Sequence, residues 1–247
     1  MGPSPEAALS NVGVILPAGG KGMRVGRVEP KQFLPLGSAG GTSFAKPMLM
    51  YAVESFHRLA RVKSIALVLP PDRIAAFSKL LSDFPKVKLV KGGAERWESV
   101  RHGFHALDAS VSMVLVHDVA RPFVTEAVIQ RCLDAAESDA CVIAALPATD
   151  TIKEVNQNLI TKTLDRRCLI FVQTPQVFPR TFLEKIYAHP WTGDIPTDEA
   201  QMAERLGMEV RWVLGSEGNR KVTGAEDLLW AEWMASRQVA GQAFPNA

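Results

Sequence analysis

The sequence predicts an α/β fold in which a mainly parallel, twisted sheet is flanked by helices and carries a protruding β-arm. Short β-branched runs alternate with segments of helical period, which is typical of parallel strands joined by helices. Several of the runs are apolar on both faces, as strands covered by helices on each side are. The alternation breaks over 148–178, where polar and apolar residues alternate around a turn at residues 156–158.

The apolar runs predict strands over residues 12–17, 64–70, 87–92, 112–118, 141–147 and 208–215. Helical patterns lie near residues 46–60, 71–83, 95–108, 125–138, 180–188, 198–206 and 224–237. Asp72 and Thr125 are placed to cap the helices that follow them. The helix from Glu95 has one apolar face, made of Trp97, Val100, Phe104 and Leu107. Three polar side chains of the same segment project elsewhere: Arg96, Ser99 and His102.

A two-stranded ribbon is only marginally stable alone, so the arm, residues 148–174, is expected to pack against a second subunit. The rest of the chain predicts a single domain over 11–237, with loose tails at 1–10 and 238–247. No internal repeat or long linker divides it. The expected assembly is a homodimer formed through the arm.

The composition excludes several classes of protein. The chain has 247 residues with 28 basic and 26 acidic side chains, which gives no electrostatic case for a nucleic-acid or membrane-surface protein. Its cysteines, Cys132, Cys141 and Cys168, lack CxxC spacing, so neither a disulfide framework nor a zinc site is expected. No apolar run reaches membrane-spanning length and no signal peptide opens the chain. A cytoplasmic protein is expected.

The stretch from Val12 to Pro35 contains the most informative motif, a strand that ends in the loop AGGKGMR. Backbone N–H groups of such a loop can bind an anion, and Arg24 and Lys31 can neutralise phosphate charge. The stretch therefore predicts a nucleotide-triphosphate site, with Pro30 stiffening the chain before Lys31. A plain tight turn is the alternative, because the loop lacks both a P-loop ending and a dinucleotide fingerprint.

Two further segments have a functional and a structural interpretation. Gly93 and Ser99 belong to a glycine turn that leads into a helix, which can contact a base or ribose or can be an ordinary helix start. Asp118 and Arg121 follow a buried strand, where open α/β sheets bind ligands; a structural Asp–Arg pair is the alternative. His117 is expected to be a packed histidine. Segments 165–167, 197–199 and 219–223 are unremarkable by themselves.

Taken together, the segments resemble the 2-C-methyl-D-erythritol 4-phosphate cytidylyltransferase family. The motifs AGGKGMR, PKQF, GGAERWES, HDVARPF, DTIK, LDR, TPQVF, TDE and NRKVT occur in the family's order from about Val12 to Glu232. The resemblance implies a nucleotidyltransferase-type, Rossmann-like fold and a homodimer whose arm reaches into the partner. It also implies transfer of CMP from CTP to the polyol phosphate, with release of pyrophosphate.

The resemblance assigns roles residue by residue. The nucleotide-binding set is Ala18, Gly19, Gly20, Gly22, Gly93 and Ser99. Arg24 and Lys31 match residues that stabilise the α-phosphate as it becomes five-coordinate. The acceptor-binding set is Asp118, Arg121, Thr151 and Thr197. Lys221 and Arg166 match positions that hold the acceptor for catalysis, Arg166 from the arm across the dimer interface.

The chemistry needs positioning and charge neutralisation more than a strong base, because a phosphate monoester is already a nucleophile. Mg²⁺ is expected on the triphosphate and not in a protein cage. The chain departs from the family pattern at Ala94, where an acidic residue is common, and at Ala148, where a basic residue is common. The glycine-rich loop 38–42 has no evident role.

Three alternatives to this function differ from it in acceptor, in catalysis or in cofactor. A cytidylyltransferase of the same fold could use ribitol 5-phosphate as acceptor. A non-catalytic sensor could bind CTP without turnover, although it would have less need of both Arg24 and Lys31. A nicotinamide dehydrogenase would require the full glycine fingerprint, which is absent.

Overall fold

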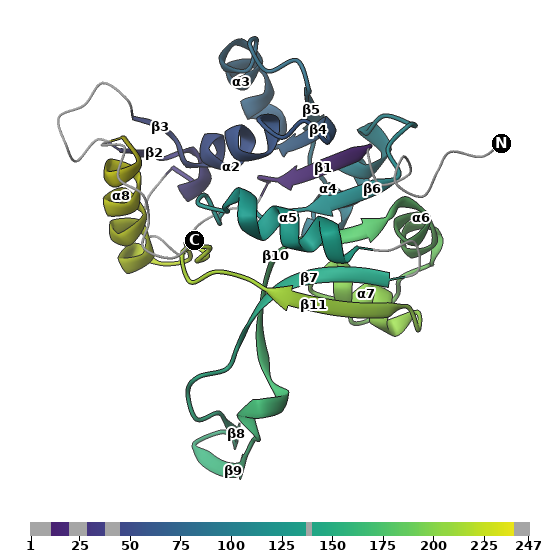
Figure 1. The fold of residues 1–247 in the computed structure, drawn as a ribbon, viewed down its shortest axis with the longest axis vertical. Coiled ribbons are helices and arrows are strands. Elements are labelled where there is room, and N and C mark those ends of the chain that lie inside the picture. Colours follow the sequence, from purple (N-terminus) through teal and green to yellow (C-terminus); the bar gives the residue numbers. More distant parts are fainter. Residues whose placement is uncertain (1–10, 20–28, 38–44, 137–139, 240–247) are drawn as a thin grey trace.

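The computed structural model describes residues 11–19, 29–37, 45–136 and 140–239. A seven-stranded sheet lies at its centre, with helices on both faces (Figure 1). Its strand order is β11-β7-β10-β6-β1-β4-β5. The bounds of these strands are β1 Val12–Pro17, β4 Val62–Leu69, β5 Val87–Lys91, β6 Met113–Val116, β7 Ala140–Pro147, β10 Ile170–Pro179 and β11 Glu209–Leu214.

Adjacent strands pair in parallel except at β10, which runs antiparallel to both β6 and β7. The predicted mainly parallel sheet is therefore confirmed, and each of the six predicted strands is present. The prediction missed β10. The apolar sequence of this strand is interrupted by polar residues and a proline, at Gln173, Thr174, Pro175 and Gln176. The pairing of β10 with β7 also shifts register between Val172 and Gln176.

The helices are α2 Met48–His57, α3 Ile74–Leu80, α4 Arg96–Ala106, α5 Glu126–Ala135, α6 Arg180–Ala188, α7 Glu199–Arg205 and α8 Ala225–Val239. Thr125 caps α5 as predicted, its side chain accepting from Val128 N–H. The prediction that Asp72 caps a helix is wrong. Asp72 lies inside a 3₁₀ turn, η3 Pro71–Arg73, and α3 begins after it without a side-chain cap.

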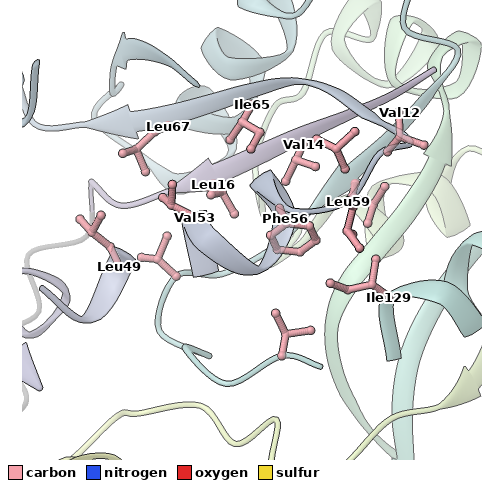
Figure 2. Packing of buried hydrophobic residues seen from close by; sticks show 14 of the residues in the cluster. Val12, Val14, Leu16, Leu49, Val53, Phe56, Leu59, Ile65, Leu67 and Ile129 are labelled. Carbon is pink, nitrogen blue, oxygen red and sulfur yellow. The ribbon is translucent and has the colours of Figure 1, made fainter. Parts of the chain in front are cut away.

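Strand β1 is buried on both faces, which explains its uninterrupted apolar sequence. Figure 2 shows Val14 and Leu16 on the face that packs against Phe56 of α2. Ile15 faces the opposite side, where Phe104 of α4 belongs to the second core cluster. Because β1, β4, β5 and β6 run parallel, their carboxyl ends lie at one edge of the sheet.

Two short sheets lie outside the central one. Strands β2 Pro35–Leu36 and β3 Lys46–Pro47 pair beside α8, after the 3₁₀ turn η2 Lys31–Phe33. Strands β8 Lys153–Asn156 and β9 Leu159–Thr163 form the predicted hairpin, which projects away from the sheet (Figure 1). A further 3₁₀ turn, η4 Arg166–Cys168, connects β9 to β10. Among the described helices, none combines the length and apolar character that crossing a bilayer requires.

Candidate functional site

The predicted nucleotide-binding residues that the structure describes lie together beyond the ends of β1 and β5. Ala18 follows β1, donates its N–H to Val68 O at 2.8 Å and accepts from Gln32 Nε2 at 2.9 Å. A Cβ on Gly19 would lie 3.6 Å from Ser99 Oγ. The predicted members Gly20 and Gly22 lie outside the described residues.

Ser99 links the two glycine segments. Its hydroxyl donates to Glu95 O at 3.1 Å and accepts the Gly93 N–H at 3.0 Å. A Cβ on Gly93 would lie 2.4 Å from Glu98 Cβ, so only glycine fits there. Ala94, at the position where an acidic residue is common, donates its N–H to Glu98 Oε2 at 2.8 Å. Gly19, Gly93 and Ser99 thus lie close together, and their role at a nucleotide stays a prediction.

Lys31 lies in η2, directly after Pro30, whose φ of −60° is the value that the proline ring imposes. Its Nζ donates to Val222 O at 2.5 Å. Lys31 therefore reaches the segment that contains Lys221, so the residue predicted at the α-phosphate contacts the segment predicted to bind the acceptor. Arg24, its predicted partner at the α-phosphate, lies outside the described residues.

Four of the predicted substrate and catalytic residues line one cavity of about 200 Å³: Asp118, Arg121, Thr197 and Lys221. The other lining residues are Arg96, Val172, Gln173, Thr174, Gln176 and Asp198. The cavity lies between the loop after β6 and the start of α7, where Asp198 caps the helix by accepting from Gln201 N–H at 2.8 Å. A polar cavity with three cationic side chains suits a phosphorylated, hydroxylated ligand.

Asp118 is ionised and held from two sides. Lys221 Nζ lies 2.6 Å from its Oδ2, and Arg96 Nη2 lies 3.2 Å from its Oδ1. Burial alone would raise the pKa of Asp118, but Arg96 and Lys221 outweigh it and hold the pKa well below the usual range.

The predicted alternative, a structural pair between Asp118 and Arg121, is wrong. Arg121 donates instead to Asn219 O at 2.8 Å and to Val172 O at 3.1 Å. These bonds tie the loop after β6 to β10 and to the segment before Lys221. Burial lowers the pKa of Arg121, and the nearby Asp118 charge opposes that effect.

His117 is fully buried, as the sequence predicts for a packed histidine. Its Nε2 lies 3.0 Å from Arg121 O, which can only accept, so Nε2 is the protonated nitrogen. Nδ1 therefore accepts from Thr174 Oγ1 at 3.0 Å, and Thr174 Oγ1 in turn accepts the Asp118 N–H at 3.1 Å. Burial lowers the pKa of His117 to about 4. The neutral ring fixes the loop that presents Asp118.

The two predicted residues of the arm are separate from this cavity within one chain. Thr151 is exposed, and Arg166 lies in η4, where its Nη1 donates to Thr149 O at 2.5 Å. Their predicted role on a partner's acceptor stays a prediction. Ala148 is buried, and its N–H donates to Leu169 O at 3.0 Å.

Two charged residues of the site, Arg96 and Glu199, were not predicted from the sequence. Arg96 Nη1 lies 2.8 Å from Glu199 Oε2, and Glu199 is completely buried. An acidic residue in the first turn of a helix is ordinary at the surface, so nothing in the sequence marked Glu199 as an internal partner. Among the described residues, no group of three or more His, Cys, Asp or Glu side chains could hold a metal ion.

Comparisons with known proteins identify the family of the chain. The sequence model of the 2-C-methyl-D-erythritol 4-phosphate cytidylyltransferase family matches residues 12–237. The enzyme of that name from Alkaliphilus metalliredigens is 36% identical over 242 residues, which cover 96% of this chain and 98% of the relative. A bifunctional enzyme from Desulfotalea psychrophila is 35% identical over 91% of this chain, but the chain spans only 56% of that relative's length.

Solved structures give the same result. The crystal structure of 4-diphosphocytidyl-2C-methyl-D-erythritol synthase from Anaerococcus prevotii has a TM-score of 0.75 and 26% identity, over 93% of this chain and all of that chain. The fold and the sequence thus agree over nearly the whole domain. The chain belongs to the 2-C-methyl-D-erythritol 4-phosphate cytidylyltransferase family.

Proposed function

We propose that the chain transfers CMP from CTP to 2-C-methyl-D-erythritol 4-phosphate, giving the CDP derivative and pyrophosphate for isoprenoid biosynthesis. The observation that carries this proposal is the shared cavity of Asp118, Arg121, Thr197 and Lys221 beside Lys31. Asp118 can accept hydrogen bonds from the polyol hydroxyls, while Lys221 attracts the acceptor's phosphate.

In the reaction, an oxygen of the acceptor's phosphate forms a bond to the α-phosphorus of CTP. The bond from that phosphorus to the bridging oxygen breaks, and pyrophosphate leaves with the electron pair. Because both reactants are anions, the protein's main task is to position them and to neutralise charge. We assign charge stabilisation at the α-phosphorus to Arg24 and Lys31, and the cytidine to the segments around Gly19, Gly93 and Ser99.

Mg²⁺ enters the proposal as part of the substrate, bound to triphosphate oxygens and water. Two carboxylates in the described part of the chain line the cavity, and both are already engaged. Asp118 is paired with Arg96 and Lys221, and Asp198 accepts from Gln176 Nε2 and Gln201 N–H, so neither is well suited to bind a cation as well. We therefore assign no metal ligand to the described residues.

The proposal includes a homodimer in which the partner's Arg166 would complete the acceptor site. Exposed apolar side chains on the hairpin support this assembly: Val155, Leu159 and Ile160, with 60%, 74% and 65% of their surface accessible. The arm projects away from the sheet (Figure 1), and Arg166 is not among the residues that line the cavity of its own chain. We place the reaction in the cytoplasm, where unpaired cysteines such as Cys132 and Cys141 are usual.

A single assay tests the proposed function. Purified enzyme receives CTP and Mg²⁺ with either 2-C-methyl-D-erythritol 4-phosphate or ribitol 5-phosphate, and pyrophosphate release is followed. The expected result is release with the methylerythritol acceptor, with a far lower kcat/KM for ribitol 5-phosphate. Turnover of ribitol 5-phosphate alone would contradict the proposed acceptor. Binding of CTP without any release would indicate a sensor.

A further inference from the structure

Arg96 joins three segments that are far apart in the sequence. It is the first residue of α4, immediately after the glycine turn that contains Gly93. Its Nε and Nη2 lie 3.3 and 3.2 Å from Asp118 Oδ1, and its Nη1 lies 2.8 Å from Glu199 Oε2. A planar guanidinium that is bonded on two sides has little freedom to rotate. Arg96 therefore fixes Asp118 relative to the start of α7.

Glu199 is an unusual residue to find inside the protein. It is completely buried, and Arg96 is its salt-bridge partner among the described residues. Burial raises the pKa of this carboxyl, and Arg96 opposes the effect. Its Oε1 has no hydrogen-bond partner within the described part of the chain. A buried ion pair is often no more stable than an apolar pair of the same size, so stability alone does not account for it.

The ion pair of Arg96 and Glu199 lies where it can position the residues predicted to bind the acceptor. Thr197 and Asp118 both line the cavity, and Thr197 lies two residues before Glu199. Because Arg96 bonds both Asp118 and Glu199, it connects the two segments that supply these lining residues. Glu199 also occupies Arg96 Nη1, which keeps that donor from attracting the acceptor's phosphate.

Lys221 cannot hold Asp118 alone throughout the reaction. Its side chain is 43% exposed, and the acceptor's phosphate would compete for its ammonium group. Asp118 then needs a second cation that does not move with the ligand. Arg96 meets this requirement because its side chain is partly buried and Glu199 holds it from behind.

We propose that Arg96 and Glu199 form a positioning pair that orients Asp118 for the acceptor's hydroxyl groups and reserves Lys221 for its phosphate. This inference rests on the proposed function. It predicts that Glu199 affects acceptor binding through Asp118. It also predicts no effect of Glu199 on CTP binding, even though its partner Arg96 lies next to the glycine turn that is assigned to the cytidine.

The first test measures Glu199→Gln in the full-length enzyme, with CTP and 2-C-methyl-D-erythritol 4-phosphate varied in turn. The KM for the acceptor should rise about tenfold, as expected when a hydrogen bond to a charged group is lost, while the KM for CTP stays within about twofold. Inorganic phosphate should compete with the acceptor more strongly than in the wild type, because Arg96 is released. The matched control is Glu184→Gln, which removes an exposed carboxylate paired with Arg180 at 3.2 Å, and it should behave as wild type.

The second test asks whether Glu199 acts through Asp118. The double variant Asp118→Asn/Glu199→Gln should have an acceptor KM no higher than Asp118→Asn alone, since the positioning pair then has nothing to hold. If the two substitutions instead raised the acceptor KM additively, the proposal would be overturned. An acceptor KM in Glu199→Gln equal to that of the wild type, or equal rises in both KM values, would overturn it too.

If Glu199→Gln folds poorly, Arg96→Lys provides the same test, because lysine keeps the charge but cannot bond both carboxylates in one plane. The same selective rise in acceptor KM is expected, and its absence overturns the proposal. A wild-type enzyme that fails to use the methylerythritol acceptor would instead contradict the proposed function, so the two failures are distinguishable.

Discussion

Lys31 is hydrogen-bonded to Val222, the residue that directly follows Lys221. Lys31 Nζ donates to Val222 O at 2.5 Å, and Lys221, the preceding residue, places its Nζ 2.6 Å from Asp118 Oδ2. Lys31 is expected at the α-phosphate and Lys221 at the acceptor. A phosphate oxygen would compete with the Val222 carbonyl for Lys31, so nucleotide binding and the placement of Lys221 are expected to be linked.

We expect Lys31→Ala to reduce turnover by about 10²–10³-fold, which is typical when one aimed charge donor is removed from a transition state. The fold should persist, because Lys31 belongs to a short turn and not to the core. Pyrophosphate release at saturating CTP and acceptor measures the effect. Lys88→Ala is the matched control, since Lys88 pairs with the exposed Asp108 at 2.6 Å on the edge strand β5. A Lys31→Ala enzyme that keeps a third or more of the control's rate would contradict the assigned role.

Arg166→Ala should weaken use of the acceptor and leave CTP binding unchanged, because Arg166 lies in the arm and away from the glycine segments. The expected change is a rise in acceptor KM of at least about tenfold, the size associated with a lost hydrogen bond to a charged group. Arg167→Ala is the control, because Arg167 pairs with Asp165 at 2.7 Å next to it. Equal loss of CTP and acceptor binding would mean that the arm has another role.

Mixed dimers test whether Arg166 acts on the partner's site. A preparation of Lys31→Ala and Arg166→Ala subunits, unfolded and refolded together, should recover up to about a quarter of wild-type activity. In half of the dimers formed at random, one site combines an intact Lys31 with an intact Arg166 from the other chain. No recovery would indicate that Arg166 serves its own chain or no site at all.

The stability of the protein should fall as the pH drops from about 6.5 to about 4, because folding lowers the pKa of His117 from 6.5 to about 4. The unfolded chain then binds a proton that the native protein excludes. The contribution of the neutral His117 to the free energy of unfolding is complete above pH 6.5 and is lost between about pH 6.5 and 4. This contribution is on the order of 3 kcal/mol. His57, whose pKa burial also lowers, contributes in the same direction.

His117→Gln isolates the contribution of His117, since glutamine can donate and accept but does not titrate. Urea unfolding at a series of pH values should show a flatter dependence for this variant than for the wild type between pH 6.5 and 4. The exposed His105→Gln should follow the wild type. Parallel curves for His117→Gln and wild type would contradict a buried neutral imidazole.

The sequence predicted the parts of the fold whose patterns are local. Strands β1 and β6 are apolar throughout, and β4 is apolar from Ile65 to Leu69, because both faces of these stretches are buried. The glycine-rich segments follow the ends of β1 and β5 as expected. Strand β10 was not predicted as a strand of the central sheet, because residues 148–178 were assigned as a whole to the hairpin of the arm. Three of its buried residues, Gln173, Thr174 and Gln176, are polar and are satisfied by tertiary hydrogen bonds, so they do not form the continuous apolar run of a buried strand.

Two residues of the predicted acceptor pocket, Asp118 and Arg121, were expected from their position after a buried strand. Thr197 and Lys221 were predicted through the resemblance alone. Asp118, Thr197 and Lys221 come together only when the strand order places β6 and β10 side by side and brings α7 to the same edge. The role of Arg96 could not be predicted for the same reason. Its two partners, Asp118 and Glu199, lie 22 and 103 residues away in the sequence.

Asp227 organises the segment that contains Lys221, and its replacement should therefore affect both stability and catalysis. Its Oδ2 accepts from Thr223 N at 2.8 Å, Thr223 Oγ1 at 2.6 Å and Gly224 N at 3.0 Å, and its Oδ1 pairs with Arg220 at 2.6 Å. Burial would raise its pKa, but these bonds lower the pKa to about 2.

Asp227→Asn should reduce the free energy of unfolding by about 1.5–3 kcal/mol at neutral pH and raise the acceptor KM, whereas Glu226→Gln, an exposed neighbour, should change neither. Because a depressed carboxyl pKa stabilises above about pH 3.8 and the effect is lost as the pH falls through about 2, the stability difference between Asp227→Asn and wild type should shrink in acid. A difference that stays constant down to pH 2 would show that the charge of Asp227 is not what holds the segment.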